Sequence, residues 1–155
     1  MSMLRRPTSR FDSGSGYPAP FHEPCAARIR KQLGDAGGLN DFGVNLLTLP
    51  PGAWSSQRHW HNIEDEFVYV LSGEVVLITD AGETKLRAGD CAAFPKNTPD
   101  GHHIINRSNA DATLLEVGTR TEDDVTTYPD IDMKYDPELG GYVHRSGEKY
   151  PEREA

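Results

Sequence analysis

Three histidines and one glutamate are the residues of this sequence best suited to bind a metal ion. His59 and His61 are two residues apart, so on a β-strand both side chains leave the same face. Glu66 follows five residues later, and the polar stretch 62–65 must turn the chain back to bring its carboxylate opposite the histidine pair. His102 comes from a later strand. Together they form a mixed nitrogen and oxygen set suited to divalent Fe, Mn, Ni, Co or Zn.

The same pattern has alternative interpretations. A His-x-His pair also occurs on the polar rim of a strand with no ligand role. His103 is an alternative to His102, and Glu64 and Asp65 are alternatives to Glu66. No phosphate-binding loop, dinucleotide-binding glycine motif or nucleophile elbow occurs, so the sequence predicts no organic cofactor and assigns no catalytic side chain apart from these ligands.

Short apolar runs separated by glycine and proline turns predict the elements that position these residues. Many short strands joined by frequent turns are typical of an all-β sandwich or barrel. Residues 26–33 fit either an edge strand or a short helix, and we expect a strand. Cys91 is expected to be a small buried hydrophobic residue. The predicted strands are residues 44–49, 54–61, 66–72, 75–80, 84–87, 91–94, 102–106 and 113–117.

Composition narrows the class of protein. A chain of 155 residues fits one domain. Its net charge of -8 argues against a nucleic-acid partner, which needs a basic surface. No apolar run approaches the roughly 20 residues that span a bilayer, and no secretory signal is visible. The two cysteines are far apart, which excludes a disulfide framework. We therefore expect a cytoplasmic protein without a membrane partner.

The chain divides into three predicted segments. Residues 1–24 are rich in Arg, Ser, Gly and Pro and predict a flexible N-terminal arm. Residues 25–120 hold the predicted barrel. Residues 121–155 are acidic but contain apolar anchors, so we expect this extension to pack on the barrel or on a neighbouring subunit. These anchors include Tyr128, Ile131, Met133, Tyr135, Tyr142, Val143 and Tyr150.

Two coupled motifs identify the sequence as similar to the cupin superfamily over residues 44–117. The first motif is formed by Gly52, His59, His61, Glu66 and Gly73, and the second by Gly89, Pro95, His102 and Asn106. The chain looks like a small single-domain bacterial cupin of the conserved-barrel type, some members of which carry a sugar-phosphate isomerase label. The resemblance implies a double-stranded β-helix, or jelly-roll barrel, with N- and C-terminal arms, frequently dimeric, that holds a metal inside its mouth.

The sequence departs from the cupin motifs in ways that test the ligand assignment. The second motif has Asn97 where a glycine is usual, and asparagine also tolerates a positive φ. The intact spacing from His102 to Asn106 favours His102 over His103, and strand alternation agrees. The six-residue gap before Gly73 favours Glu66 over its two acidic neighbours.

The expected function is that of a metal-dependent enzyme. One divalent ion per chain, acting as a Lewis acid on a small oxygenated substrate, fits an isomerase, a lyase or a dioxygenase. Candidate substrates are sugars, sugar phosphates, enediols and diketones. The alternative is a non-catalytic cupin that binds or senses a small ligand or a metal.

Partner predictions rest on two further groups of residues. A phosphorylated substrate needs a cation near the barrel mouth, and the candidates are Arg58, Lys85, Arg87 and Lys96. A homodimer is expected from the apolar outer faces of Phe67, Tyr69 and Leu71.

Overall fold

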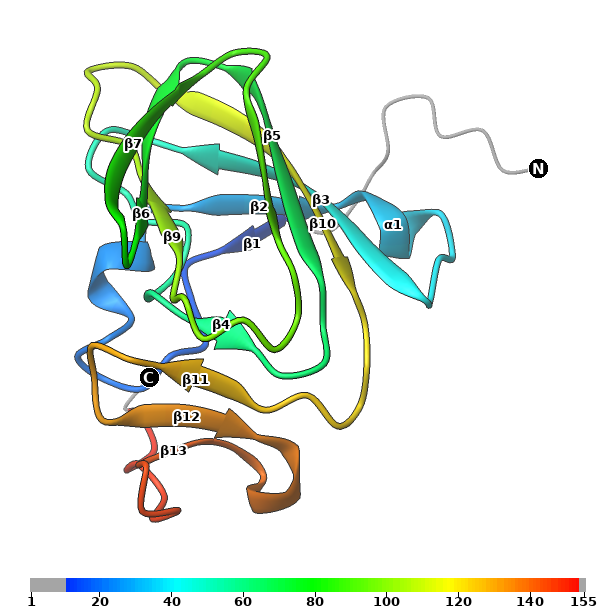
Figure 1. The fold of residues 1–155 in the computed structure, drawn as a ribbon, viewed down its shortest axis with the longest axis vertical. Helices are drawn as coiled ribbons and strands as arrows, with labels where there is room; N and C mark the ends of the chain where they lie inside the picture. Colours follow the sequence, from blue (N-terminus) through cyan, green and yellow to red (C-terminus); the bar gives the residue numbers. More distant parts are fainter. Residues whose placement is uncertain (1–10, 154–155) are drawn as a thin grey trace.

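The computed structural model describes residues 11–153, and most of its elements are antiparallel strands (Figure 1). Residues 1–10 of the predicted N-terminal arm lie outside the described residues. The strands are β1 (Phe11–Ser13), β2 (Ile29–Gln32), β3 (Phe42–Leu49), β4 (Trp60–His61), β5 (Glu66–Ser72), β6 (Glu74–Thr79), β7 (Gly82–Arg87), β8 (Cys91–Phe94), β9 (His103–Ile105), β10 (Ala112–Thr119), β11 (Thr126–Tyr128), β12 (Met133–Asp136) and β13 (Gly141–Val143).

Helices are few and short. They are η1 (Glu23–Cys25), α1 (Leu33–Ala36) and η2 (Pro137–Leu139). Within the described residues, no helix is long and apolar enough to cross a membrane. The ambiguous stretch 26–33 is resolved as β2 followed by the start of α1.

The described strands form three sheets. One sheet has the order β1-β2-β3-β10-β5-β8, a second β7-β6-β9, and a third β13-β12-β11-β4. Figure 1 shows β6, β7 and β9 on one side of the molecule, β3, β5 and β10 on the other, and β11 to β13 below them. This arrangement confirms the predicted all-β jelly-roll fold.

Strand alternation builds the core between the two upper sheets. Leu47 of β3 lies directly opposite Leu114 of β10, and both side chains are fully buried. Val70 of β5 and Val75 of β6 extend the same cluster from the two facing sheets. Because residues two apart share a face, each strand contributes every second residue to this core.

The outer face of β5 is apolar and exposed. Phe67, Tyr69 and Leu71 are 36%, 39% and 47% exposed. Cys91 lies opposite Tyr69 in the register of β5 and β8 and shares this outer face, so it is exposed. The prediction that Cys91 is buried is therefore wrong. The residues of β8 that pack against the core are Ala92 and Phe94, and they lie on the opposite face of the strand from Cys91.

Segments from the two ends of the described chain pack on each other at the lower end of the barrel. Tyr17 and Cys25 are buried in a second apolar cluster with Tyr128 and Met133. β11 also pairs with β4, which places Thr126 opposite His61. The later segment thus forms a wall next to the histidine pair. The domain boundaries at residues 24 and 120 stay a prediction.

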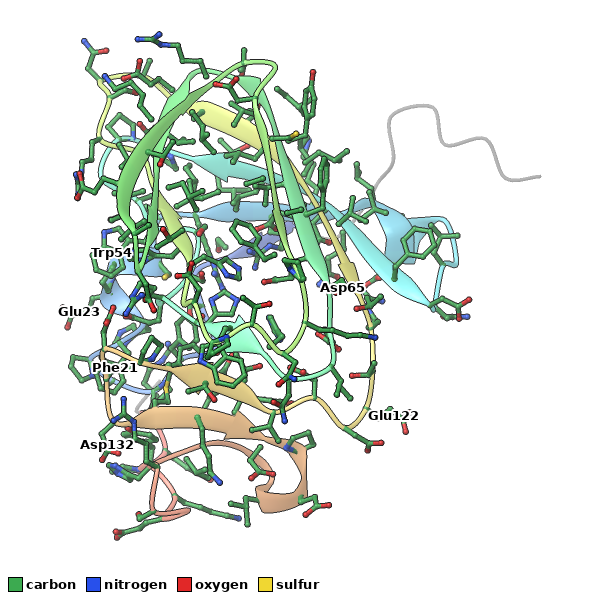
Figure 2. All side chains as sticks on the ribbon, viewed as in Figure 1. Phe21, Glu23, Trp54, Asp65, Glu122 and Asp132 are labelled. Atoms are coloured by element: carbon green, nitrogen blue, oxygen red, sulfur yellow. The ribbon has the colours of Figure 1, made fainter. Side chains whose placement is uncertain are left out.

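The predicted strand 54–61 is shorter than expected, because polar side chains there bind the backbone of other segments. The Ser55 hydroxyl accepts from the Ile104 N–H, and the Gln57 amide donates to the Phe21 carbonyl. Figure 2 shows Trp54, at the start of this stretch, on the same flank as Phe21. Only the last two residues of the stretch form β4.

The turn before the second motif histidine has the predicted geometry. Asn97 has a φ of 55°, the only positive φ of a non-glycine residue within residues 11–153. Its backbone N–H donates to the carbonyl of His61 over 2.8 Å. The asparagine that replaces the usual glycine therefore makes the turn and ties it to the histidine pair.

Candidate metal centre

His59 and His61 present their rings on one face of the chain as it enters the barrel. His61 lies in β4, and His59 forms an isolated bridge with His102. The ring centroids of His59 and His61 are 4.9 Å apart, with their planes at 89°. Their two-residue spacing along an extended backbone is the cause of this shared orientation.

Glu66, the first residue of β5, places its carboxylate among three imidazoles. Its Oε2 atom lies 3.3 Å from His59 Nε2 and 3.4 Å from His61 Nε2. The same oxygen accepts a 2.7 Å hydrogen bond from His102 Nε2. All four side chains singled out by the sequence motifs thus converge on one carboxylate oxygen.

The two acidic neighbours of Glu66 have other partners. Glu64 Oε1 accepts from the N–H and the hydroxyl of Thr121, at 2.7 Å and 3.0 Å. Asp65 Oδ1 accepts from the backbone N–H of Lys96 at 2.8 Å. Of the three carboxylates, Glu66 is the one that faces the imidazole Nε2 atoms.

The adjacent histidines His102 and His103 point in different directions. The ring of His102 stacks on Phe94, with centroids 3.6 Å apart and planes within 3° of parallel. His103 Nδ1 instead lies 3.0 Å from the Ser56 carbonyl oxygen, and its ring packs edge-on against Trp54. Alternation along the extended backbone that leads into β9 therefore places His102 in the cluster and His103 outside it.

Protein acceptors fix the outer nitrogens of the histidine pair. His59 Nδ1 lies 2.9 Å from the Gln57 carbonyl oxygen, and His61 Nδ1 lies 2.6 Å from Asp124 Oδ2. A carbonyl and a carboxylate accept hydrogen bonds, so each Nδ1 carries the proton. In the neutral ring Nε2 then holds the lone pair, which is the form that binds a metal.

Asp124 is a site residue that sequence reasoning missed. It is buried, its Oδ1 accepts from the Ile63 N–H at 2.9 Å, and its Oδ2 accepts from the Thr126 hydroxyl at 3.0 Å. These bonds hold the carboxylate against His61. The sequence offered no signal for this role, because Asp124 is one of several acidic residues in the C-terminal segment.

The surroundings of the cluster shift the pKa values of Glu66, His61 and His102. Burial alone would raise the pKa of Glu66, but the charge of His59 and hydrogen bonds from the imidazoles hold that pKa well below its usual range. Burial opposes the charged form of His61, yet the Glu66 and Asp124 carboxylates raise its pKa to about 9. For His102, burial prevails over Glu66 and lowers the pKa. The centre therefore holds an ionised carboxylate beside a proton-binding His61.

Among the described residues, two groups of three His, Asp or Glu side chains have ligand atoms within 4.8 Å of one another. One is His59, His61 and Glu66, and the other is His61, Glu64 and Asp124. The second group faces the protonated Nδ1 of His61, and its carboxylates already accept hydrogen bonds from the chain. When its two imidazoles are neutral, the first group offers two Nε2 lone pairs and a carboxylate oxygen, the donor types that first-row divalent metals accept. The side chains of this first group therefore fit a divalent ion.

A cavity of about 630 Å³, called the metal-centre cavity below, opens beside the centre. His59 and Glu66 line it together with Tyr17, Tyr128 and Tyr142, which come from the segments that pack across the lower end of the barrel. The ring of Tyr128 lies 5.9 Å from that of His59. A small molecule in this cavity would contact both the centre and these phenol side chains.

The cationic side chains of the cavity are not those predicted from the sequence. Arg28 and Arg30 line it, and Arg30 forms two bonds to Glu116, at 2.7 Å and 3.0 Å. The sequence signal that could have indicated this role is their two-residue spacing in the stretch 26–33, which places both side chains on one face of a strand, as in the histidine pair. The predicted candidates are absent from its lining among the described residues: Arg58, Lys85, Arg87 and Lys96.

A smaller cavity of about 190 Å³ reaches the centre from another direction. His61 and Glu66 line both cavities, whereas Trp60, Thr79 and Asp100 belong to the smaller one alone. The carboxylate of Glu66 therefore borders two separate spaces.

Comparison with known proteins identifies the family. Residues 45–118 match the model of the cupin domain. A sugar phosphate isomerase of the cupin superfamily from Silicibacter pomeroyi is 44% identical, with a TM-score of 0.89 over 97% of each chain. A proposed sugar phosphate isomerase from Acidithiobacillus ferrooxidans is 32% identical, with a TM-score of 0.73 over 83% of each chain. A comparison with curated proteins finds no match.

A more distant structure shares the fold alone. It is a predicted oxalate decarboxylase from Thermotoga maritima, 24% identical, with a TM-score of 0.58 over 77% of this chain and 100% of that one. The matched domain and the two more similar structures show that this chain belongs to the cupin superfamily.

We expect Asp124→Asn to lower the pKa of His61, because the substitution removes a carboxylate charge 2.6 Å from Nδ1. In chelator-treated protein, an NMR titration of the His61 ring should give a pKa of about 9 for the wild type and a lower value for the variant. A raised pKa stabilises the fold fully below the unfolded value of about 6.5, and this stabilisation is lost as the pH rises through about 9. The variant should therefore lose less stability across this interval.

A matched control exists at the surface. His144 Nδ1 and Asp132 Oδ2 form the same kind of pair at 2.9 Å. Asp132→Asn should leave the titration of His61 unchanged. An unaltered His61 pKa in Asp124→Asn would contradict the role assigned to Asp124.

Proposed function

We propose that His59, His61, Glu66 and His102 bind one divalent metal ion per chain, and that the protein is an enzyme acting on a small oxygenated substrate in the adjacent cavity. The observation that carries the proposal is the approach of three imidazole Nε2 atoms to within 3.4 Å of one carboxylate oxygen. Open sites with mixed histidine and carboxylate ligands are typical of catalytic metals.

A divalent ion bound there would act as a Lewis acid on vicinal oxygens of a substrate. The residues of the chain prepare the site for it. Asp124 and the Gln57 carbonyl hold the Nδ1 protons of His61 and His59, so that both rings turn Nε2 toward Glu66. These contacts keep the ligand side chains in place before a metal or a substrate arrives.

A sugar phosphate or a related polyol is the substrate class that best fits the surroundings. The 44% and 32% identical relatives are both described as sugar phosphate isomerases. The hydroxyl groups of Tyr17, Tyr128 and Tyr142 and the guanidinium groups of Arg28 and Arg30 suit a ligand with several oxygens. Burial raises the pKa of Tyr128 well above its usual range, so its hydroxyl keeps its proton as a donor.

His59→Ala should abolish turnover while leaving the fold intact, because the aliphatic core of the barrel does not include this side chain. We expect at least a roughly 100-fold loss of activity, since even groups that only orient a ligand commonly contribute 10–100-fold. The measurement pairs activity against sugar phosphates, diketones and polyphenols with melting temperature, each with and without chelator.

His144→Ala provides the control, because His144 lies outside the cluster and bonds to Asp132. It should retain wild-type activity. The wild type could instead bind metal but turn over none of these compounds, while His59→Ala melts at a much lower temperature. This result would support a non-catalytic binding module with a structural metal.

We also propose that the outer face of β5 forms the interface of a homodimer. Phe67, Tyr69 and Leu71 stand in a row on this face, and Leu115 of the neighbouring β10 lies opposite Tyr69. A continuous uncharged apolar row is self-complementary across a two-fold axis, which is the symmetry of most dimers. A second copy of the chain is therefore its proposed occupant.

Tyr69→Lys should convert the dimer to a monomer, because the new ammonium group would be buried against an apolar partner surface. Sedimentation at micromolar concentration measures the change, and the exposed Cys91 opposite Tyr69 reports it independently through faster thiol labelling. Leu139→Lys is the control, since Leu139 is equally exposed, at 39%, but lies on η2. A monomeric wild type with a freely reactive Cys91 would contradict the proposal.

A further inference from the structure

Another cavity, of about 370 Å³, lies where the two ends of the described chain meet. Residues 13–16 form part of its wall. Arg28, which directly precedes β2, Arg30 of β2 and Arg153 near the C-terminal end also line it. Figure 1 shows the C-terminal end returning beside the segment between β1 and β2. Arg153 closes this contact by donating to the carbonyl of Ser15 over 3.0 Å.

The charge of this cavity is opposite to that of the whole chain. Arg28, Arg30 and Arg153 line it, and no aspartate or glutamate is among its described lining residues. The chain as a whole has a net charge of -8. Glu116, which pairs with Arg30, lines the metal-centre cavity and not this one. Arg28 and Arg153 therefore line this cavity without a carboxylate partner among the side chains that the structure describes.

Arg28 is the most informative member of this group. It is 9% exposed, and within the described residues it forms no ion pair. Its Nε donates to the Gly14 carbonyl over 2.8 Å, its Nη1 donates to the Ser55 carbonyl, and its guanidinium lies 5.9 Å from the ring centroid of Tyr17. Carbonyl dipoles and an aromatic ring orient a buried cation without neutralising it, and an unneutralised buried charge is costly.

Arg153 is held in a similar way. Its Nη1 donates to the carbonyl oxygens of Ser15 and Tyr17, at 3.0 Å and 3.3 Å, and it has no carboxylate partner among the described residues. Apart from these bonds, the guanidinium groups of Arg28 and Arg153 donate no further hydrogen bond to the described groups of residues 13–153. Both side chains are thus positioned by backbone contacts while donors remain for a ligand.

We propose that this cavity binds the phosphoryl group of a small phosphorylated molecule. Arginine donors from separate segments match the several acceptor oxygens of a phosphoryl group better than the two of a carboxylate. Ser13 and Ser15 add hydroxyl groups, and Gly14, with a φ of 82°, leaves the backbone of this loop open to close approach. The volume exceeds that of a bare anion and leaves room for an organic group.

Phosphoryl binding at this site does not require a bound metal, but the site shares lining residues with the metal-centre cavity. Arg28 and Arg30 line both cavities, so a phosphoryl group bound here lies against a wall of the proposed substrate space. Two sources share this chemistry. The phosphoryl group is either one end of the substrate itself or part of a separate phosphorylated ligand.

Inorganic phosphate is the probe for the test. Binding is measured by calorimetry and by backbone amide NMR shifts in chelator-treated full-length protein, against sodium chloride at equal ionic strength. Phosphate should perturb the amides of residues 13–16. Arg153→Gln and Arg28→Gln should each weaken binding at least about tenfold, or about 1.4 kcal/mol, because each removes a charged hydrogen-bond donor. Circular dichroism checks that both variants are folded.

Arg107→Gln is the matched control, because it removes one exposed guanidinium that pairs with Glu83 far from this cavity. It should bind phosphate like the wild type. The proposal is overturned when phosphate binds no better than chloride, or when folded Arg153→Gln and Arg28→Gln both bind phosphate as tightly as Arg107→Gln does. Because no metal is present in this assay, failure of the metal proposal leaves its result unchanged.

Competition identifies the source of the phosphoryl group. Metal-loaded protein is saturated with phosphate and then titrated with a sugar phosphate or with the corresponding unphosphorylated sugar. Displacement of phosphate by the sugar phosphate alone assigns the site to the substrate. Simultaneous binding of both ligands assigns it to a separate phosphorylated molecule.

Discussion

The contact of the Glu66 carboxylate with three imidazoles is the interaction on which the rest of the architecture depends. A buried carboxylate is costly unless cations or hydrogen-bond donors surround it. His102 donates to Glu66 at 2.7 Å, and the His59 and His61 Nε2 atoms lie within 3.4 Å. Three separate parts of the barrel must therefore be held together: the approach to β4, the first residue of β5, and the segment that leads into β9. The jelly-roll fold provides this convergence, and its aliphatic core keeps it rigid.

The segments outside the barrel strands complete the centre instead of merely covering it. β11 pairs with β4, which brings Thr126 opposite His61 and Asp124 against its Nδ1. Residues from the N-terminal side then supply cations, because Arg28 and Arg30 reach the cavity beside the centre. Although the chain is negatively charged overall, its charges are therefore unevenly distributed. Carboxylates orient the imidazoles, and arginines line the metal-centre cavity and the cavity where the two chain ends meet.

The fold and the convergence of the four motif side chains could be predicted because both follow from local rules. Two-residue spacing places His59 and His61 on one face, and the motif spacing selects Glu66 and His102. Asp124, Arg28 and Arg30 could not be placed in the same way, because their positions depend on pairing between segments distant in sequence. Cys91 was misplaced for a related reason, since the sequence of β8 is apolar on both faces and does not indicate which face meets the core.

Metal content is the most direct measurement of the central claim. Protein purified without chelator or metal-affinity resin, and portions reconstituted separately with Fe, Mn, Co, Ni and Zn, would be analysed by elemental mass spectrometry. We expect about one divalent ion per chain in the wild type for at least one of these metals, and far less than one in folded Glu66→Gln protein. A wild type that retains none of the five metals in stoichiometric amount would contradict it.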